Sequence, residues 1–159
     1  MARKGTIRPR KIEIDPIYGS VMLTKLINRS MKDGKKSVVR KEVYAALEII
    51  RAKTNEEPVK IFEQALENIR PTMEVRARRV GGAAYQVPQQ VRGPRRDSLA
   101  IRWLVAAANS KSNTEFHTFA EKLASELMDA AKGEGVSVKK RQEVEKVAEA
   151  NKAFSHFRW

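Results

Sequence analysis

Residues 116–131 read FHTFAEKLASELMDAA, and this stretch decides the fold class. Its apolar residues recur at three- and four-residue steps, which places them on one face of a helix. Gly133, a residue that commonly ends helices, follows shortly afterwards. The spacing therefore predicts an amphipathic helix whose buried face is formed by Phe116, Phe119, Ala120, Leu123, Ala124, Leu127 and Ala131.

Similar spacing predicts three helices on the N-terminal side of this stretch. Ser20 is a candidate cap for a first helix that ends at Gly34, and Ser37 is a candidate cap for a second. Pro58 suits the first turn of a third helix, and Pro71 would stop it. Each helix carries an apolar stripe, so we expect them to pack on one another.

Two further helices are predicted, one just before residues 116–131 and one after them. One follows Gly93-Pro94, although the sequence leaves its first residue open, and a final helix begins at about Lys140. About six helices in 159 residues fit a single bundle-like domain. We therefore expect a mainly α fold, with one helical domain over residues 12–159.

The pattern changes between Thr72 and Val91, where apolar and basic residues alternate on either side of Gly81-Gly82. Alternation of this kind with a central Gly-Gly predicts a two-stranded β-hairpin with a tight primed turn. Pro88 cannot donate to a strand ladder, which argues against a large sheet. We expect a protruding, free arm at about residues 72–91. An isolated hairpin is only marginally stable, so we expect its binding partner to order it.

The charge balance indicates a polyanionic partner. The chain has 32 Lys and Arg against 19 Asp and Glu, a net charge of +13. Its pI of about 10.2 is typical of nucleic-acid-binding domains. A membrane-spanning role is excluded by the lack of an apolar run of about 18 residues, and binding to a membrane surface is the weaker alternative. Residues 1–11 contain no acid and resemble neither a signal nor a transit peptide. They predict a basic, flexible tail.

The residues do not favour an enzyme. The segment 33–37, DGKKS, lacks the first glycine of a phosphate-binding loop and has a second lysine where Ser or Thr should follow. The chain has no cysteine, and its two histidines, His117 and His156, belong to no metal-ligand cluster. We therefore predict no catalytic site, metal or cofactor.

The positive signal is a set of basic clusters on different local structures. They lie in the tail, in the loop after the first helix, on the arm and around the start of the fourth helix. Aromatic residues make up only 6% of the chain, too few for a single-strand stacking platform. We therefore favour folded RNA over single strands; a DNA-binding protein that uses the same arm is the rival. The candidate contacts are Arg3, Lys4, Arg8, Arg10, Lys11, Lys32, Lys35, Lys36, Arg76, Arg78, Arg79, Arg92, Arg95, Arg96 and Arg102.

Several stretches resemble the family of bacterial and organellar small-subunit ribosomal protein seven. These stretches span nearly the whole chain, which makes the resemblance specific. The sequence departs from the family pattern at Gly93-Pro94 and in the loop 109–114. The matching segments are 15–20 (DPIYGS), 33–37 (DGKKS), 78–82 (RRVGG), 85–88 (YQVP), 99–104 (LAIRWL) and 148–154 (AEANKAF).

The resemblance implies a six-helix domain with a hairpin that binds the three-prime major domain of small-subunit ribosomal RNA and initiates assembly of the subunit head. It also implies contact with a neighbouring ribosomal protein, a ribosome in the cytoplasm or inside an organelle, and, as in some bacterial members, repression of the protein's own messenger RNA. The family's hairpin and C-terminal region lie near transfer RNA in the exit site. The matching positions are Gly81, Gly82, Tyr85, His156 and Arg158.

Overall fold

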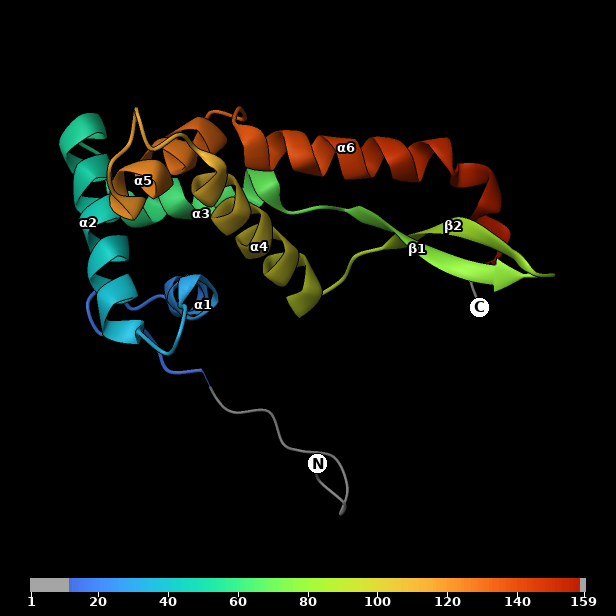
Figure 1. The fold of residues 1–159 in the computed structure, drawn as a ribbon, viewed down its shortest axis with the longest axis horizontal. Helices are drawn as coiled ribbons and strands as arrows, with labels where there is room; N and C mark the ends of the chain where they lie inside the picture. The colour runs from blue at the N-terminus through green and yellow to red at the C-terminus, as the bar shows by residue number, and fades with distance from the viewer. Residues whose placement is uncertain (1–11, 158–159) are drawn as a thin grey trace, which may run out of the picture.

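Helix α5 (Phe119–Ala131) lies inside the helical body and contacts α2, α3, α4 and α6 in the computed structural model, which describes residues 12–157 (Figure 1). Its predicted stripe is buried from Ala120 to Leu127, whereas Phe116 precedes the helix. The helix begins at a capping box. The Thr118 hydroxyl accepts from the Glu121 N–H, while the Glu121 carboxylate accepts from the Thr118 N–H.

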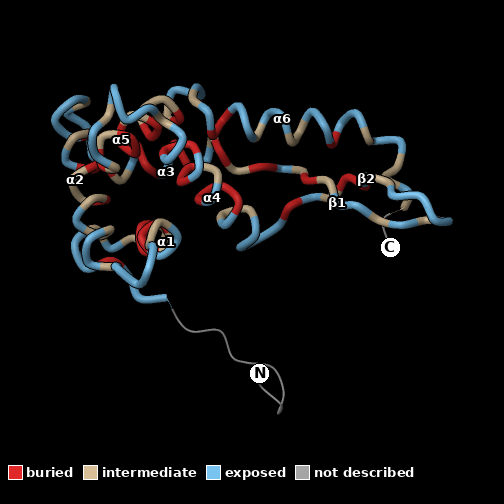
Figure 2. The backbone as a smooth tube through the Cα atoms, in the orientation of Figure 1, coloured by how far each residue is buried: buried red, intermediate tan, exposed pale blue. Residues whose placement is uncertain are grey.

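Four further helices share one hydrophobic core with α5. They are α1 (Val21–Ser30), α2 (Lys36–Thr54), α3 (Pro58–Ile69) and α4 (Pro94–Ser110). Fully buried side chains such as Leu26, Leu47, Phe62 and Leu104 come from all four helices. Figure 2 shows these buried segments facing one another inside the body. The predicted mainly α architecture is confirmed, and the fourth helix begins at Pro94.

The helix starts test the predicted caps. Ser20 caps α1 and accepts a hydrogen bond from the Leu23 N–H, as predicted. The prediction for Ser37 is wrong: α2 already begins at Lys36, and no side chain caps it. Helix α1 ends at Ser30 rather than at Gly34, which lies in the following loop with a φ of 73°. The loop between α1 and α2 is therefore longer than the glycine alone indicated.

Helix α6 (Val136–Ala150) starts at Val136 and not near Lys140, as the periodicity predicted. Glu126 on α5 explains the earlier start, because its buried carboxylate accepts hydrogen bonds from the N–H and hydroxyl of Ser137. This partner satisfies a backbone donor of the first turn, which would otherwise lack one. A short 3₁₀ helix, η1 (Lys152–Phe157), follows α6.

The hairpin has the predicted position and turn. Strands β1 (Met73–Val80) and β2 (Ala83–Gln90) pair antiparallel, and Val80 lies opposite Ala83. Gly81 and Gly82 have φ angles of 59° and 88°, so both central residues of the turn are left-handed. A type I′ turn requires this conformation, which glycine adopts without strain.

The hairpin extends away from the helical body, but the expectation of a free arm is wrong. Helix α6 runs beside it, and η1 returns against β2 (Figure 1). At its base, the N–H and hydroxyl of Thr72 donate to Glu145 on α6 at 2.9 and 2.7 Å. Val87 and Pro88 are buried. Residues 136–157 therefore support the hairpin, which does not depend on an outside partner for all its order.

Candidate nucleic-acid interface

The base of the arm joins two of the predicted basic clusters through one carboxylate. Arg76 follows Glu74 by two residues on β1, so the alternation of a strand places both on the same face. After β2, Gly93 has a φ of 54° and Pro94 begins α4, so the chain turns sharply into the helix and brings Arg95 back to the base of β1. Glu74 thus lies between an arginine of the arm and an arginine of α4.

Both arginines donate to the Glu74 carboxylate. Oε1 accepts from Nε of Arg76 at 2.8 Å and from Nε of Arg95 at 2.9 Å. Nη2 of Arg95 lies 2.7 Å from Oε2. The Glu74 side chain is only 10% exposed, whereas those of Arg76 and Arg95 are 51% and 50% exposed. The carboxylate therefore lies inside and the two guanidinium groups lie at the surface.

The electrostatics of this trio favour the charged carboxylate. Burial alone would raise the pKa of Glu74, but the hydrogen bonds from Arg95 and Arg76 outweigh burial and hold its pKa below the ordinary value. The hydrogen bond to Glu74 in turn raises the pKa of Arg95. Arg95 lies in the first turn of α4, where the helix dipole disfavours a cation, and the negative charge of Glu74 offsets that effect.

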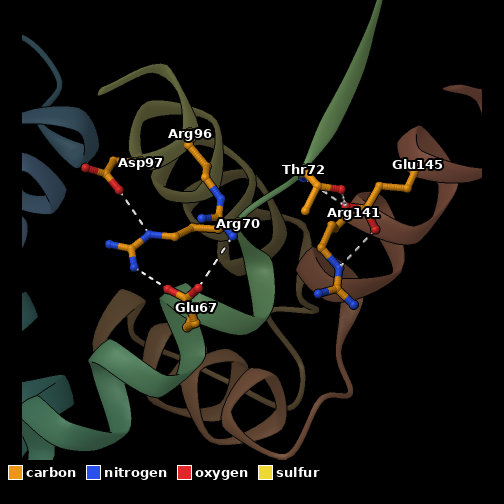
Figure 3. A network of polar contacts seen from close by, with 7 residues as sticks. All are labelled: Glu67, Arg70, Thr72, Arg96, Asp97, Arg141 and Glu145. Carbon is orange, nitrogen blue, oxygen red and sulfur yellow. Dashed lines mark hydrogen bonds and ion pairs between the residues drawn. The ribbon is translucent and has the colours of Figure 1, made fainter. Parts of the chain in front are cut away.

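A second network fixes the arm base to α3, α4 and α6 (Figure 3). Arg70, which follows α3, donates to Asp97 on α4 at 3.0 Å and also pairs with Glu67. Arg96, a predicted RNA contact, lies 3.4 Å from Glu67. Its guanidinium thus serves this internal network. The same figure shows Thr72 bonded to Glu145, which also pairs with Arg141.

The remaining basic residues near the arm differ in their surroundings. Arg79 is exposed near the tip, opposite Ala84, and Arg78 is half-buried, opposite Tyr85. Arg92 is exposed and donates to Gln90 at 2.8 Å. Arg102 is exposed on α4, two helical turns from Arg95. These positions agree with a cationic surface along the arm and α4.

The predicted loop cluster lies apart from this surface. Lys32 and Lys35 line a groove of about 310 Å³ with Asn109 and Phe119, near the C-terminal end of α4. Arg95 is at the N-terminal end of the same helix. At a rise of 1.5 Å per residue, the two ends are separated by roughly 20 Å. Lys36 is half-buried at the start of α2. The structure therefore separates two basic regions along one helix.

A groove between α1 and the N-terminal half of α4 contains basic residues that the sequence reasoning missed. It measures about 370 Å³, and Lys25 and Arg29 of α1 line it with Pro94 and Ser98 of α4. Arg29 is exposed, whereas Lys25 pairs with Asp97 at 3.4 Å. Both basic residues were visible in the first helix, but no local pattern indicated that α1 packs against the start of α4.

The predicted transfer-RNA positions form an aromatic cluster and an exposed turn. The ring of Tyr85 lies 5.2 Å from Phe154 and 5.3 Å from Phe157, centroid to centroid. His156 is exposed, and its Nδ1 lies 2.8 Å from the Ala153 carbonyl oxygen. Gly81 and Gly82 are exposed at the tip. Other candidates lie outside the described residues: Arg3, Lys4, Arg8, Arg10, Lys11 and Arg158.

Residues 12–157 offer neither a metal centre nor a membrane span. Within that range, no group of three or more His, Cys, Asp or Glu side chains could hold a metal ion. In the same part of the chain, no helix is both long and apolar enough to cross a membrane.

A helical body with an arginine-bearing arm and a net charge of +13 is typical of structural nucleic-acid-binding proteins. Comparison with known proteins identifies the family, because the family model for Ribosomal protein S7p/S5e matches residues 2–152. The chain belongs to this family, as its resemblance predicted. It is a structural, non-enzymatic component of the small ribosomal subunit, with ribosomal RNA and ribosomal proteins as partners.

Curated relatives match the whole chain. Proteins named "Small ribosomal subunit protein uS7" from Carboxydothermus hydrogenoformans, Rhodopseudomonas palustris and Moorella thermoacetica are each 54% identical to it over 159 residues. Each alignment covers 100% of both chains. These matches favour the ribosomal role over the DNA-binding and membrane-surface alternatives.

Proposed function

We propose that this chain binds the three-prime major domain of small-subunit ribosomal RNA and initiates assembly of the subunit head. The observation that carries the proposal is the trio at the arm base, where Glu74 unites Arg76 of β1 with Arg95 of α4. Arginine pairs bidentately with phosphate, and folded RNA presents phosphates from separate strands close together. An arm fixed against a helix suits such a junction.

The direct test is a binding titration at several stated salt concentrations. It uses a transcript of the three-prime major domain, a transcript of equal length from another small-subunit rRNA domain, and duplex DNA. We expect the first to bind most tightly, with steep salt dependence, because each phosphate contact releases counterions. Equal affinity for all three nucleic acids, or a nearly flat salt dependence, would contradict the proposal.

The proposal extends to the exit site, where the hairpin tip and the C-terminal region would lie beside transfer RNA. The exposed His156 side chain and the exposed Gly81-Gly82 turn give that end of the molecule a surface that a nucleic acid can approach. The chain has no cysteine, so one introduced cysteine takes a tethered radical probe cleanly. A probe at Ala84→Cys should cleave exit-site transfer RNA in assembled subunits. The matched probe at Ala52→Cys, exposed on α2, should not.

A folded segment of the protein's own messenger RNA is the second RNA partner in this proposal, because the same cationic surface would recognise it. Adding that segment to the titration tests repression. Competition with the ribosomal transcript is expected if one surface binds both RNAs. Simultaneous binding of both RNAs would assign the messenger to another surface.

A further inference from the structure

Glu74 is an acidic residue at the centre of a surface that we propose binds an anion. Simple charge counting makes it unfavourable there, because a negative charge within a Debye length of a phosphate repels it. Yet the carboxylate is nearly buried and contacts both arginines. A role for Glu74 in binding must therefore come from what it does to their geometry.

The contacts use only one edge of each guanidinium. Arg76 donates through Nε, and Arg95 donates through Nε and Nη2. A guanidinium has five N–H donors in a planar fork, so each arginine retains donors on its outer edge. Both Nε atoms contact the same oxygen, Oε1, which holds the two groups side by side. About half of each side chain stays accessible to solvent.

The geometry points to Glu74 as a positioning residue: it clamps Arg76 and Arg95 by their inner edges so that their outer edges bind one RNA phosphate together. This inference rests on the proposed function and deepens it. Free arginines have long, mobile side chains, and ordering them on binding costs conformational entropy. Because Glu74 already orders both arginine side chains in the unbound protein, less conformational entropy is lost when RNA binds. The two side chains are in this sense preorganised.

The inference predicts a result opposite to charge counting. Glu74→Gln removes a negative charge from the surface, so electrostatics alone would tighten RNA binding. If Glu74 positions the arginines, affinity for the three-prime major domain transcript should fall by about threefold or more, in the range seen for residues of one network. Glu143→Gln is the matched control, because Glu143 is an exposed acid on α6 that pairs with Lys140. Its affinity should stay level or rise.

A second variant separates the effect of side-chain geometry on RNA binding from the effect of charge. Glu74→Asp keeps the charge but shortens the side chain by one methylene, and it should also weaken binding. Circular dichroism melting identifies any variant that fails to fold, and affinities are compared only among folded variants. Binding by folded Glu74→Gln and Glu74→Asp as tight as wild type would overturn the inference.

A double-mutant cycle shows whether Glu74 acts through the arginines. In an Arg76→Ala, Arg95→Ala background, Glu74→Gln should no longer weaken binding, because it has no guanidinium left to position. An equal loss in both backgrounds would overturn the inference. If the arginine variant alone bound with wild-type affinity and salt slope, the proposed interface itself would fail, and this outcome is distinct from failure of the positioning role.

Discussion

Glu126 and Glu74 are both buried carboxylates that contact basic side chains, but they lie in different regions and face opposite ways. Glu126 is fully buried between α5 and α6; its partner Lys111 lies 3.3 Å away and is only 14% exposed. Glu74 lies at the arm base, where its two arginines are half exposed. In the first region the cation faces the interior, and in the second the cations face solvent.

The difference separates a structural ion pair from a candidate binding site. Lys111 is held on several sides, because it also contacts Ser125 and Asp129 at 2.9 and 3.0 Å, and few of its donors remain for a ligand. The arginines at Glu74 keep donors at the surface. A buried acid therefore points to function only when the cations that it binds remain accessible.

The largest expected effect is on the stability of the Glu126 region. Glu126→Ala should lower the free energy of unfolding by about 3 to 5 kcal/mol, because it leaves the buried N–H and hydroxyl of Ser137 without their acceptor and removes one of the two anionic partners of Lys111. Urea denaturation measures the change. The control is Asp129→Ala, which removes a more exposed partner of the same lysine and should cost less than about 1 kcal/mol. Similar costs for both variants would show that the burial of Glu126 adds nothing to its contribution to stability.

Leu123 tests the apolar side of the same region. It is fully buried on α5, so Leu123→Ala should cost about 2 to 5 kcal/mol through lost transfer energy and a residual cavity. Among the folded molecules, affinity for the RNA transcript should be unchanged. A negligible shift in the thermal midpoint would show that this stripe contributes little to the core.

Variants of the arm should lose RNA affinity and keep their stability, which is the reverse of the result expected for Leu123→Ala. Arg76→Ala, Arg78→Ala and Arg79→Ala together should change the melting temperature little, because no fully buried apolar residue is removed. RNA affinity should fall, and the slope of log affinity against log salt should become shallower by about one unit for each phosphate that the variant no longer binds. Loss of stability at unchanged affinity and slope would make these arginines structural.

The smallest expected effect concerns acid pH at the arm base. The folded-state pKa of Glu74 is lowered, so its ionisation adds stability above the ordinary carboxyl pKa. That contribution disappears as pH falls through the folded-state pKa. The difference in unfolding free energy between wild type and Glu74→Gln should therefore be largest near neutral pH and shrink in acid. A difference that stays constant with pH would contradict the lowered pKa.

Local signals in the sequence were enough to predict most of the fold. The Gly81-Gly82 turn, the cap at Ser20 and the stripe around Leu123 depend on residues close together in the chain. The start of α6 and the support of the hairpin depend on long-range partners, Glu126 with Ser137 and Glu145 with Thr72. Hydrophobic periodicity carries no information about such partners.

The same limit applies to the candidate site. Basic clusters were evident from the sequence, and the structure gives Arg76 and Arg95 a common carboxylate. The sequence could not show that Arg96 would lie beside Glu67, or that Lys35 would lie near the far end of α4. The sequence places Glu74 two residues before Arg76 but does not show its contact with Arg95, which follows from the return of the chain through Gly93.

The support of the hairpin by α6 and η1 has a consequence for the timing of synthesis. A nascent chain emerges from its N-terminus, so the strands of the arm are made well before Glu145 and Phe154, which hold its base and its flank. Until those residues are added, the arm lacks its packing against α6 and η1, and a hairpin without such packing is only marginally stable. The arm therefore gains its full support only after α6 and η1 have been synthesised, and a chain that terminates before α6 carries the arginines without that support.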